Sequence, residues 1–355
     1  MSVLDRYIVR AILSAVLLVM LVLLALGAIY IFIDQQNDIG TGHYTTLGAL
    51  YYTLLNLPQQ AYELLPITAL IGSLVGLGAL ARGSELTVVR AAGVSVAQLA
   101  GIALMAGLAL IGVELVLGEF LAPPLEQVAR LQKAFSKLNN VGFGSGTGAW
   151  VRDGDLLLNV AGQSGERQFG SMLTFELSPE HRLLAIGHAT RGTALAKGKW
   201  LLSGYSESRF AEDAVTTKQP GQHVLASNVT AGFLGLAIEN PDQLTSRALW
   251  RLISYFRSNS LDAREYVFAF WSRIARTVAI AFTVLLAIPF VLGPLRSSGT
   301  GTRMLLGLLI GIAFFLLQRL IESGTVVFAL NPVLLAWLPT LLLAIVTLTL
   351  LARVR

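Results

Sequence analysis

The sequence predicts an α-helical membrane protein with six transmembrane helices and an all-β domain inserted between the third and the fourth. Hydrophobic residues make up 54% of the 355 residues and charged residues only 13%, about half the charged share of a typical soluble domain. Six stretches are apolar over most of the roughly 20 residues that a helix needs to cross a bilayer. Between the third and fourth, short apolar runs alternate with Gly and Pro turns, which is typical of antiparallel strands. A purely soluble protein is therefore excluded.

Five of the six apolar stretches contain no charged residue: residues 11–33, 64–81, 91–113, 277–295 and 332–352. The sixth is weaker, because residues 304–318 are uncharged but a full span must include Arg319 and Glu322 and reach about residue 326. The first stretch is longer than the ~7–15 apolar residues of a cleavable signal peptide. It is therefore predicted to remain in the chain as a membrane anchor.

The distribution of Lys and Arg predicts the orientation of these helices, because short cytoplasmic loops are rich in positive charge. The loops of one side carry Arg6, Arg10, Arg82, Arg90, Arg296, Arg303, Arg353 and Arg355. The opposite short loops, 34–63 and 323–331, carry no Lys or Arg. Both termini are therefore predicted to be cytoplasmic, with the segment after the third span on the far side. Since topology accounts for part of the net charge of +5, that charge does not indicate nucleic-acid binding.

The far-side segment is predicted to form an antiparallel sandwich or open barrel. Its expected strands are residues 149–152, 156–161, 172–177, 183–189, 200–205 and 223–229, with turns at 153–155, 178–181, 196–199 and 219–221. A Gly-rich hinge is expected at 142–148, and helical spacing of apolar residues predicts a helix over 244–256. The predicted domains are 1–137 (spans 1–3), 138–243 (the β-domain) and 244–355 (the connecting helix and spans 4–6).

Catalytic chemistry has no convincing signal in this sequence. The absence of Cys excludes disulfides, thiolate metal sites and Cys nucleophiles. The motifs GxxxxGK[ST], HExxH and GxSxG are absent, and the four His residues lie at no metal-ligand spacing. We therefore expect no catalytic residue, no metal site and no ATP site in this chain. Active transport would need a partner that hydrolyses ATP or an ion gradient.

The loop between spans 2 and 3 predicts a short helix over residues 84–93. Ser84 is the expected N-cap, Glu85 suits the positive end of the helix dipole, and Gly93 suits the position after the last turn. Leu86, Val89 and Arg90 fall on one face. Two interpretations remain open: a coupling helix that inserts into a groove on a cytoplasmic motor subunit, or a helical turn that covers the end of the bundle.

Ionisable residues gather near the far-side ends of the spans: Glu63, Glu114, Glu119, Arg130, Lys133, Lys137, Arg273, Arg276, Arg319 and Glu322. Charges within a membrane usually face a cavity or one another. The cations could bind lipid phosphates, since Arg binds phosphate bidentately. They could instead snorkel to the interface or pair between helices, for example Arg319 with Glu114 or Glu119. Two GxxxG motifs, 72–76 and 307–311, indicate close helix packing, within the chain or with a second subunit.

Several short motifs, in this order and topology, resemble one known family. They are Val-Leu-Asp-Arg-Tyr-Ile at 3–8, Phe-Ile-Asp-Gln at 32–35, Ser-Glu-Leu at 84–86 with Ala-Gly at 92–93, Gly-Glu-Phe-Leu-Ala-Pro at 118–123 and Gly-Pro-Leu-Arg-Ser at 293–297. The chain resembles the LptF/LptG lipopolysaccharide-export permeases of Gram-negative inner membranes, and the G-type subunit rather than the F-type. The resemblance covers essentially the whole chain.

This resemblance implies a fold, partners and a location. The β-domain is expected to be jellyroll-like, to lie in the periplasm and to join a periplasmic bridge. The chain is expected to pair with an F-type permease and enclose a laterally open cavity for lipopolysaccharide. Two copies of a cytoplasmic ATPase, which bind ATP and Mg, are expected to contact the loop helix. A single-span regulatory subunit and a soluble bridge protein complete the expected partners, and no cofactor is expected in this chain.

The resemblance also implies particular site residues. The contact with the ATPase is expected at Ser84, Glu85, Leu86, Val89 and Arg90. G-type chains can carry basic residues near the far-side end of span 1 that contact lipid phosphates, but residues 31–38 contain no Lys or Arg here. We therefore expect Arg130, Lys133, Arg273 and Arg319 to supply the positive charge instead.

Two alternatives belong to other classes of protein. One is a membrane-embedded enzyme that modifies a lipid head group, with Glu63, Glu114, Glu119 and Asp34 as its acid and base groups. The other is a mechanotransmitting ABC scaffold that opens a periplasmic partner without itself moving lipid. Turnover of labelled lipid by the isolated chain would favour the first, and lipid cross-linked inside the bundle would count against the second.

Overall fold

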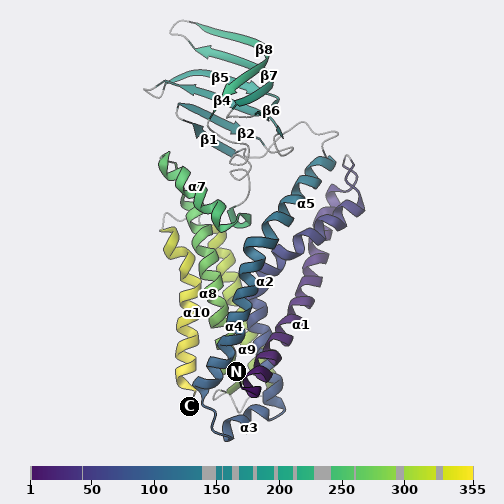
Figure 1. Cartoon of the computed structure of the whole chain (residues 1–355), viewed down its shortest axis with the longest axis vertical. Coiled ribbons are helices and arrows are strands. Elements are labelled where there is room, and N and C mark those ends of the chain that lie inside the picture. Colours follow the sequence, from purple (N-terminus) through teal and green to yellow (C-terminus); the bar gives the residue numbers. More distant parts are fainter. Residues whose placement is uncertain are drawn as a thin grey trace. The chain divides into compact units, whose positions relative to one another are not determined.

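The computed structural model describes residues 2–41, 43–137, 149–153, 155–161, 168–178, 182–195, 199–210, 214–227, 241–259, 261–292, 300–324 and 331–354 (Figure 1). The chain divides into two compact units. The helical unit comprises Met1–Asp34, Thr53–Glu126 and Arg264–Arg355. The β unit comprises Gln35–Tyr52 and Gln127–Ala263. Two helices, α2 (Thr46–Arg82) and α5 (Ala122–Lys137), run from one unit into the other.

The helical unit is built from long apolar helices. They are α1 (Val3–Asp34), α2, α4 (Val96–Val116), α8 (Arg264–Leu292), α9 (Thr300–Gly324) and α10 (Pro332–Arg353), with a short α3 (Glu85–Ala91) between α2 and α4. Among the described residues, five helical stretches are long and apolar enough to cross a membrane: Val3–Asp38, Thr46–Arg82, Val96–Arg130, Arg264–Leu292 and Pro332–Arg353. In α9 the apolar stretch found among the described residues is shorter, Leu308–Gln318. The sixth span therefore stays a prediction.

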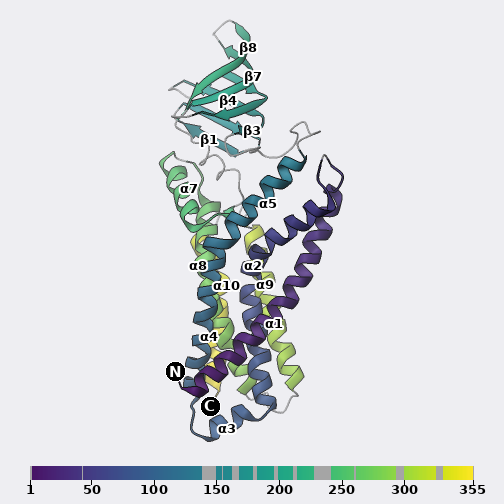
Figure 2. The same cartoon turned by 45° about the vertical axis from the view of Figure 1, so that its right-hand side comes forward.

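The core of the helical unit depends on close contact between α1 and α2 (Figure 2). Ile8, Ile12 and Val16 of α1 are almost fully buried. A Cβ atom added at Gly72 would collide with the backbone of Val16, and one at Gly76 would lie 2.8 Å from the carbonyl oxygen of Ala11. The first GxxxG motif therefore packs two helices of the same chain against each other.

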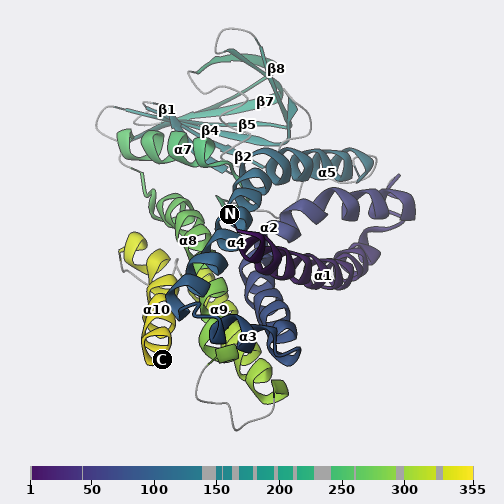
Figure 3. The ribbon, with the colours of Figure 1, turned by 60° about the horizontal axis from the view of Figure 1, so that its bottom comes forward.

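Helix α10 is joined to α8 by hydrogen bonds between membrane helices. The hydroxyl of Thr340 donates to the carbonyl of Ala275 at 3.0 Å, and that of Thr347 donates to the carbonyl of Phe282 at 3.4 Å. Figures 1 and 2 show that α3 lies at the end of the helical unit where α1 begins and α10 ends, and Figure 3 turns this end toward the viewer.

The β unit contains one curled antiparallel sheet. Its strands are β1 (Ala149–Asp153), β2 (Leu156–Val160), β3 (Gln168–Phe169), β4 (Met172–Leu177), β5 (Leu183–Ala189), β6 (Arg191–Ala194), β7 (Lys199–Phe210) and β8 (Val215–Ala226). Their order is β1-β2-β4-β5-β7-β6-β3, and β8 pairs with β7. Strands β5 and β6 pair in succession with β7, from Ala185↔Arg209 to Ala194↔Trp200. Apolar helices with an inserted antiparallel sheet are the fold class that the sequence predicts.

One face of the sheet forms the core of this unit. Fully buried side chains include Leu158, Phe169, Met172, Trp200 and Leu202. Helix α7 (Ser246–Ser258) contributes Tyr255 to the same core. Its N-cap is Thr245, whose hydroxyl accepts a hydrogen bond from the amide of Ala248 at 3.2 Å.

The strand predictions hold best where a tight turn marks the hairpin. Val151 pairs with Leu158 in the first hairpin, as expected. The predicted turn at 219–221 is wrong, because β8 continues through it. The β7–β8 pairing shifts register there, and this shift leaves Pro220 without a paired residue on β7. A Pro, which has no amide hydrogen, is tolerated at such an irregular position of a strand that pairs on one side only. Residues 142–148, 228 and 229, also part of our predictions, lie outside the described residues.

Candidate functional site

The loop helix α3 forms as predicted, but its first turn is built differently. Ser84 has φ of +59°, a left-handed conformation, and its side chain accepts no hydrogen bond from the described part of the helix. Ser84 is the N-cap residue, as predicted, but it caps through its backbone: its carbonyl accepts a hydrogen bond from the amide of Val88, and the side-chain cap that the residue type suggests is not made. Gly93 follows the helix with φ of +95°, and its amide donates to the carbonyl of Arg90, as expected for the residue after a helix.

The face of α3 that carries Leu86 points into the helical unit. Leu86 is only 3% exposed, and Val89 packs against the same core. The outer face presents Glu85 and Val88, the latter 66% exposed. The Glu85 carboxylate accepts a hydrogen bond from the hydroxyl of Tyr7 on α1, at 2.8 Å. The exposed side chains of α3 therefore include Glu85, Thr87 and Val88, with Arg90 half-exposed, while Leu86 holds the helix to the bundle.

Arg273 of α8 lies in a buried polar cluster within the helical unit. Its guanidinium donates to the carbonyl of Gly118 at 3.1 Å and to the Glu119 carboxylate at 3.3 Å. The guanidinium carbon lies 5.3 Å from the centre of the Tyr62 ring, a cation–π distance. Arg273 itself is 7% exposed. This placement braces α8 against α4 and leaves little of the side chain for a lipid.

Gly118, whose carbonyl accepts from Arg273, lies in a π-helical turn, η2 (Leu117–Leu121). A π turn interrupts the regular hydrogen-bond ladder of the helix and is frequent at functional sites. Arg273 donates to the Gly118 carbonyl that this turn presents. A Cβ atom at Gly118 would lie 2.6 Å from the Tyr62 ring, so a larger residue would push that ring away.

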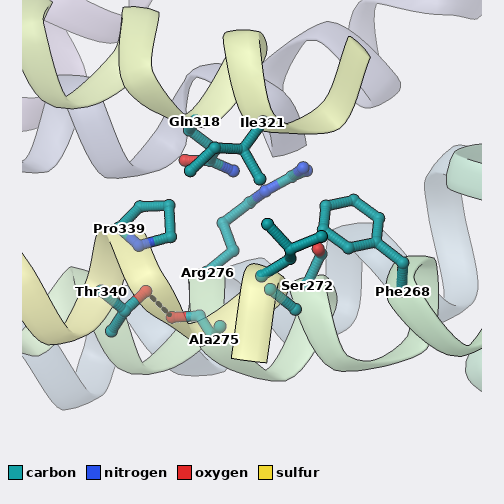
Figure 4. A pocket seen from close by; sticks show the side chains of 10 residues that line it. Phe268, Ser272, Ala275, Arg276, Gln318, Ile321, Pro339 and Thr340 are labelled. Atoms are coloured by element: carbon teal, nitrogen blue, oxygen red, sulfur yellow. Dashed lines mark hydrogen bonds between the residues drawn. The ribbon is translucent and has the colours of Figure 1, made fainter. Parts of the chain in front are cut away.

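Two further charged residues complete this cluster. Glu114 is fully buried one turn before the π turn, and Arg276 and Arg273 both lie within electrostatic reach of its carboxylate. The guanidinium of Arg276 lies 5.2 Å from the Tyr62 ring. Figure 4 shows this side chain extending into a recess between Gln318 and Ile321 of α9 and Phe268 of α8. At Glu119 the structure therefore shows a charge pair between two helices, which is one of the interpretations that the sequence left open for these residues.

Lys133 lies in a second polar cluster, within the β unit. Its ammonium is 2.7 Å from the carboxylate of Asp38, which belongs to η1 (Gln35–Asp38), the short helix after α1. The same ammonium lies 4.9 Å from the centre of the Tyr52 ring and 6.0 Å from that of Tyr44. Burial, together with the nearby Tyr52 and Asp38, raises the pKa of Tyr44 to about 12. The Tyr44 phenol is therefore neutral at physiological pH.

The three predicted phosphate-binding residues whose side chains the structure describes belong to two different units. Arg130 and Lys133 are one turn apart on α5, in the β unit. Arg273 belongs to the helical unit, where it is paired with Glu119. The side chain of Arg319 lies outside the described residues. Sequence reasoning missed Tyr62, Tyr44, Tyr52 and Asp38 as partners of these cations, and the concentration of Tyr beside the acidic loop after span 1 is the signal that could have found the last three.

Of the carboxylates considered for an enzyme, Glu63 and Glu119 have different partners. Glu63 accepts a hydrogen bond from the side-chain amide of Gln59 at 3.0 Å, one turn earlier in the same helix. Glu119 pairs with Arg273. Within the described ranges, no three Asp, Glu or His side chains come together in a way that could hold a metal ion.

Comparisons with known proteins agree with the resemblance noted from the motifs. The family model described as Lipopolysaccharide export system permease LptF/LptG matches residues 6–353. The chain is 31% identical over 354 residues to the Lipopolysaccharide export system permease protein LptG of Escherichia coli (strain K12), covering 99% of this chain and 98% of that protein. It is 29% identical over 356 residues to the protein of the same name from Haemophilus influenzae, covering 100% and 99% respectively.

Proposed function

The chain belongs to the LptF/LptG family of lipopolysaccharide export permeases, and on that premise we propose that it is the G-type permease subunit of an ATP-driven ABC transporter. This transporter extracts lipopolysaccharide from the bacterial inner membrane and passes it to a periplasmic bridge toward the outer membrane. The observation that carries the proposal is the match over almost the whole chain to permeases of that name. ATP and Mg belong to the partner ATPase, so this chain needs no cofactor of its own.

The proposed topology has both termini and α3 in the cytoplasm and the sheet in the periplasm. It is supported by the Arg residues of the loops on one side and by the position of α3 at the end where α1 begins and α10 ends. The absence of Cys makes a direct test simple. A Cys placed at Val215, 61% exposed on β8, should react with a membrane-impermeant maleimide added from the periplasmic side. A Cys at Val88, 66% exposed on α3, should react only after the membrane is opened.

We propose that α3 is the coupling helix that contacts one of two ATPase copies. The exposed carboxylate of Glu85 and the exposed apolar side chain of Val88 supply a polar and an apolar contact on its outer face. Leu86, buried on the inner face, would transmit movement of α3 to the bundle. Ser84, Val89 and Arg90 would border the contact.

We propose that Arg130 and Lys133 contact the phosphates of the lipid, with Arg319 as a further candidate. Their spacing of one turn on α5 would let both cations reach one anionic group. Arg273 acts differently, as the brace between α8 and α4. An F-type permease, a single-span regulatory subunit and a soluble bridge protein complete the complex. Strands β1 and β8, each paired on one side only among the described strands, suit the addition of a strand from a bridge domain.

Reconstitution tests this function. The chain, its F-type partner and their ATPase are assembled in proteoliposomes that contain lipopolysaccharide, and the soluble bridge protein is added outside with a photo-crosslinker. We expect ATP-dependent cross-linking of lipopolysaccharide to the bridge protein, absent with a hydrolysis-deficient ATPase. An assembled complex that hydrolyses ATP but transfers no lipid would contradict the proposal.

A further inference from the structure

Lys133, one of the cations that we assign to lipid phosphate, forms an ion pair with a carboxylate of the same chain. The Lys133 ammonium and the Asp38 carboxylate are 2.7 Å apart, and their side chains are 22% and 28% exposed. Asp38 is the last residue of η1, in the acidic segment that follows span 1, and Lys133 is on α5. Water and ligands can therefore reach this ion pair, although it is not at the open surface.

The loop after span 1 is held against α5 by contacts that do not involve this ion pair. The backbone amide of His43 donates to the carbonyl of Ser136 on α5 at 2.7 Å. Within the loop, the hydroxyl of Tyr44 donates to the side-chain carbonyl of Gln35 at 3.3 Å. Lys133 is also positioned by the Tyr52 ring, 4.9 Å away. Loss of the Asp38 charge should therefore leave both the loop and the ammonium where they are.

A carboxylate in this position competes with any phosphate for the ammonium. It occupies one of the three N–H donors of Lys133 and cancels its charge. A phosphate that binds Lys133 must displace the Asp38 carboxylate or lie beside it, and in both cases the carboxylate repels the phosphate from close by. When the lipid leaves, Asp38 can take the ammonium back. The exchange of one anion for the other needs no change of fold.

We propose that Asp38 tunes the affinity of Lys133 for a lipid phosphate, weakening its hold on the lipid so that it can be released. This inference rests on the proposed function, because it takes the phosphate-bearing lipid as the cargo of the chain. It adds that the acidic residue following span 1 regulates binding at this site. The shared chemistry is a lipid phosphate, and lipopolysaccharide or an anionic phospholipid could supply it.

Binding by the purified permease–ATPase complex tests the proposal. The probes are lipopolysaccharide, the same lipid after enzymatic removal of its lipid A phosphates, and phosphatidylglycerol. A partly exposed ion pair of this kind is worth up to about 1 kcal/mol, so Asp38→Asn should tighten lipopolysaccharide binding by up to about fivefold. Asp38→Glu should restore the wild-type affinity. Asp155→Asn, the same change at an exposed residue of the β unit, is the matched control and should alter nothing.

The double variant isolates the pair. In a Lys133→Gln background, Asp38→Asn should give no gain in affinity for lipopolysaccharide. For the dephosphorylated lipid, Asp38→Asn should give no gain in affinity with either Lys or Gln at position 133. ATP-driven transfer to the bridge protein should be slower in Asp38→Asn despite its tighter binding. A structural role alone would instead lower both stability and binding. A gain with phosphatidylglycerol equal to that with lipopolysaccharide would identify a general phosphate site.

The outcomes separate the two proposals. If the wild-type complex binds and transfers lipopolysaccharide while Asp38→Asn binds it no more tightly, the role of Asp38 is overturned and the proposed function stands. The role of Asp38 is also overturned if the gain persists without Lys133. If the wild-type complex binds no lipopolysaccharide, both proposals are overturned.

Discussion

Replacement of Arg273 by Gln should destabilise the helical unit by about 3 kcal/mol. The Arg273 and Glu119 side chains are 9% and 28% exposed, and Arg273 also donates to the Gly118 carbonyl. Removal of one partner of a buried ion pair costs about 3–5 kcal/mol, because the other charge stays buried and unpaired. Glu119 is exposed enough to recover part of its hydration, which places the expected loss at the lower end of that range.

Thermal unfolding of the permease complex in nanodiscs, followed by Trp fluorescence, measures this effect. Arg273→Lys should lose part of the stability, since it keeps the charge but not the planar fork that reaches both acceptors. The double variant with Glu119→Gln should lose less than the sum of the two single variants. If Arg273→Gln unfolds at the wild-type temperature but binds lipopolysaccharide poorly, Arg273 is a lipid ligand and the brace is refuted.

Three further predictions follow from other contacts. Glu85→Ala or Glu85→Lys should weaken co-purification with the ATPase or uncouple ATP hydrolysis from export; assembly and transport at wild-type levels would refute the assignment, and Tyr7→Phe reports the loss of the Tyr7 hydrogen bond alone. Gly72→Ile should lower the free energy of unfolding by about 2 kcal/mol or more, because the added Cβ meets the Val16 backbone, and thermal unfolding should show this as a lower unfolding temperature. Gly101→Ala, with open space around its Cβ position, is the control. Because the pKa of Tyr44 is raised to about 12 in the folded chain and is ~10 when unfolded, its contribution to stability is complete below pH 10 and is lost as the pH rises from 10 through 12. A difference titration at 295 nm against Tyr44→Phe should show that phenol ionising near pH 12, and ionisation near pH 10 would contradict its burial.

The apolar helices could be predicted from sequence because each signal lies within one segment. Residues 11–33 are long, apolar and uncharged, and no competing structure accommodates such a stretch. The hairpin around residues 153–155 is likewise a local signal. The 219–221 turn failed for the opposite reason, since the pairing of β8 with the long strand β7 overrides the local preference of Pro and Gly for a turn.

The partners of the charged residues could not be predicted in the same way. The sequence indicates that cations near the span ends need partners, but Arg273 and Glu119 are 154 residues apart and meet only through the packing of α8 on α4. The pairing of Lys133 with Asp38 likewise depends on the fold of the loop after span 1. At Ser84, residue type favours a side-chain cap, but the reversal after α2 requires a left-handed residue and leaves the hydroxyl without that role.

Mass spectrometry of the intact complex tests the central claim most directly, because it reports partners and retained lipid together. The chain is expressed with its F-type partner, the ATPase and the regulatory subunit, purified in mild detergent and ionised without dissociation. We expect one copy of this chain, one F-type chain and two ATPase copies, with lipopolysaccharide bound. A chain that is found alone or as a homodimer, with no ATPase and no lipopolysaccharide, would contradict its role as a permease subunit of a lipopolysaccharide exporter.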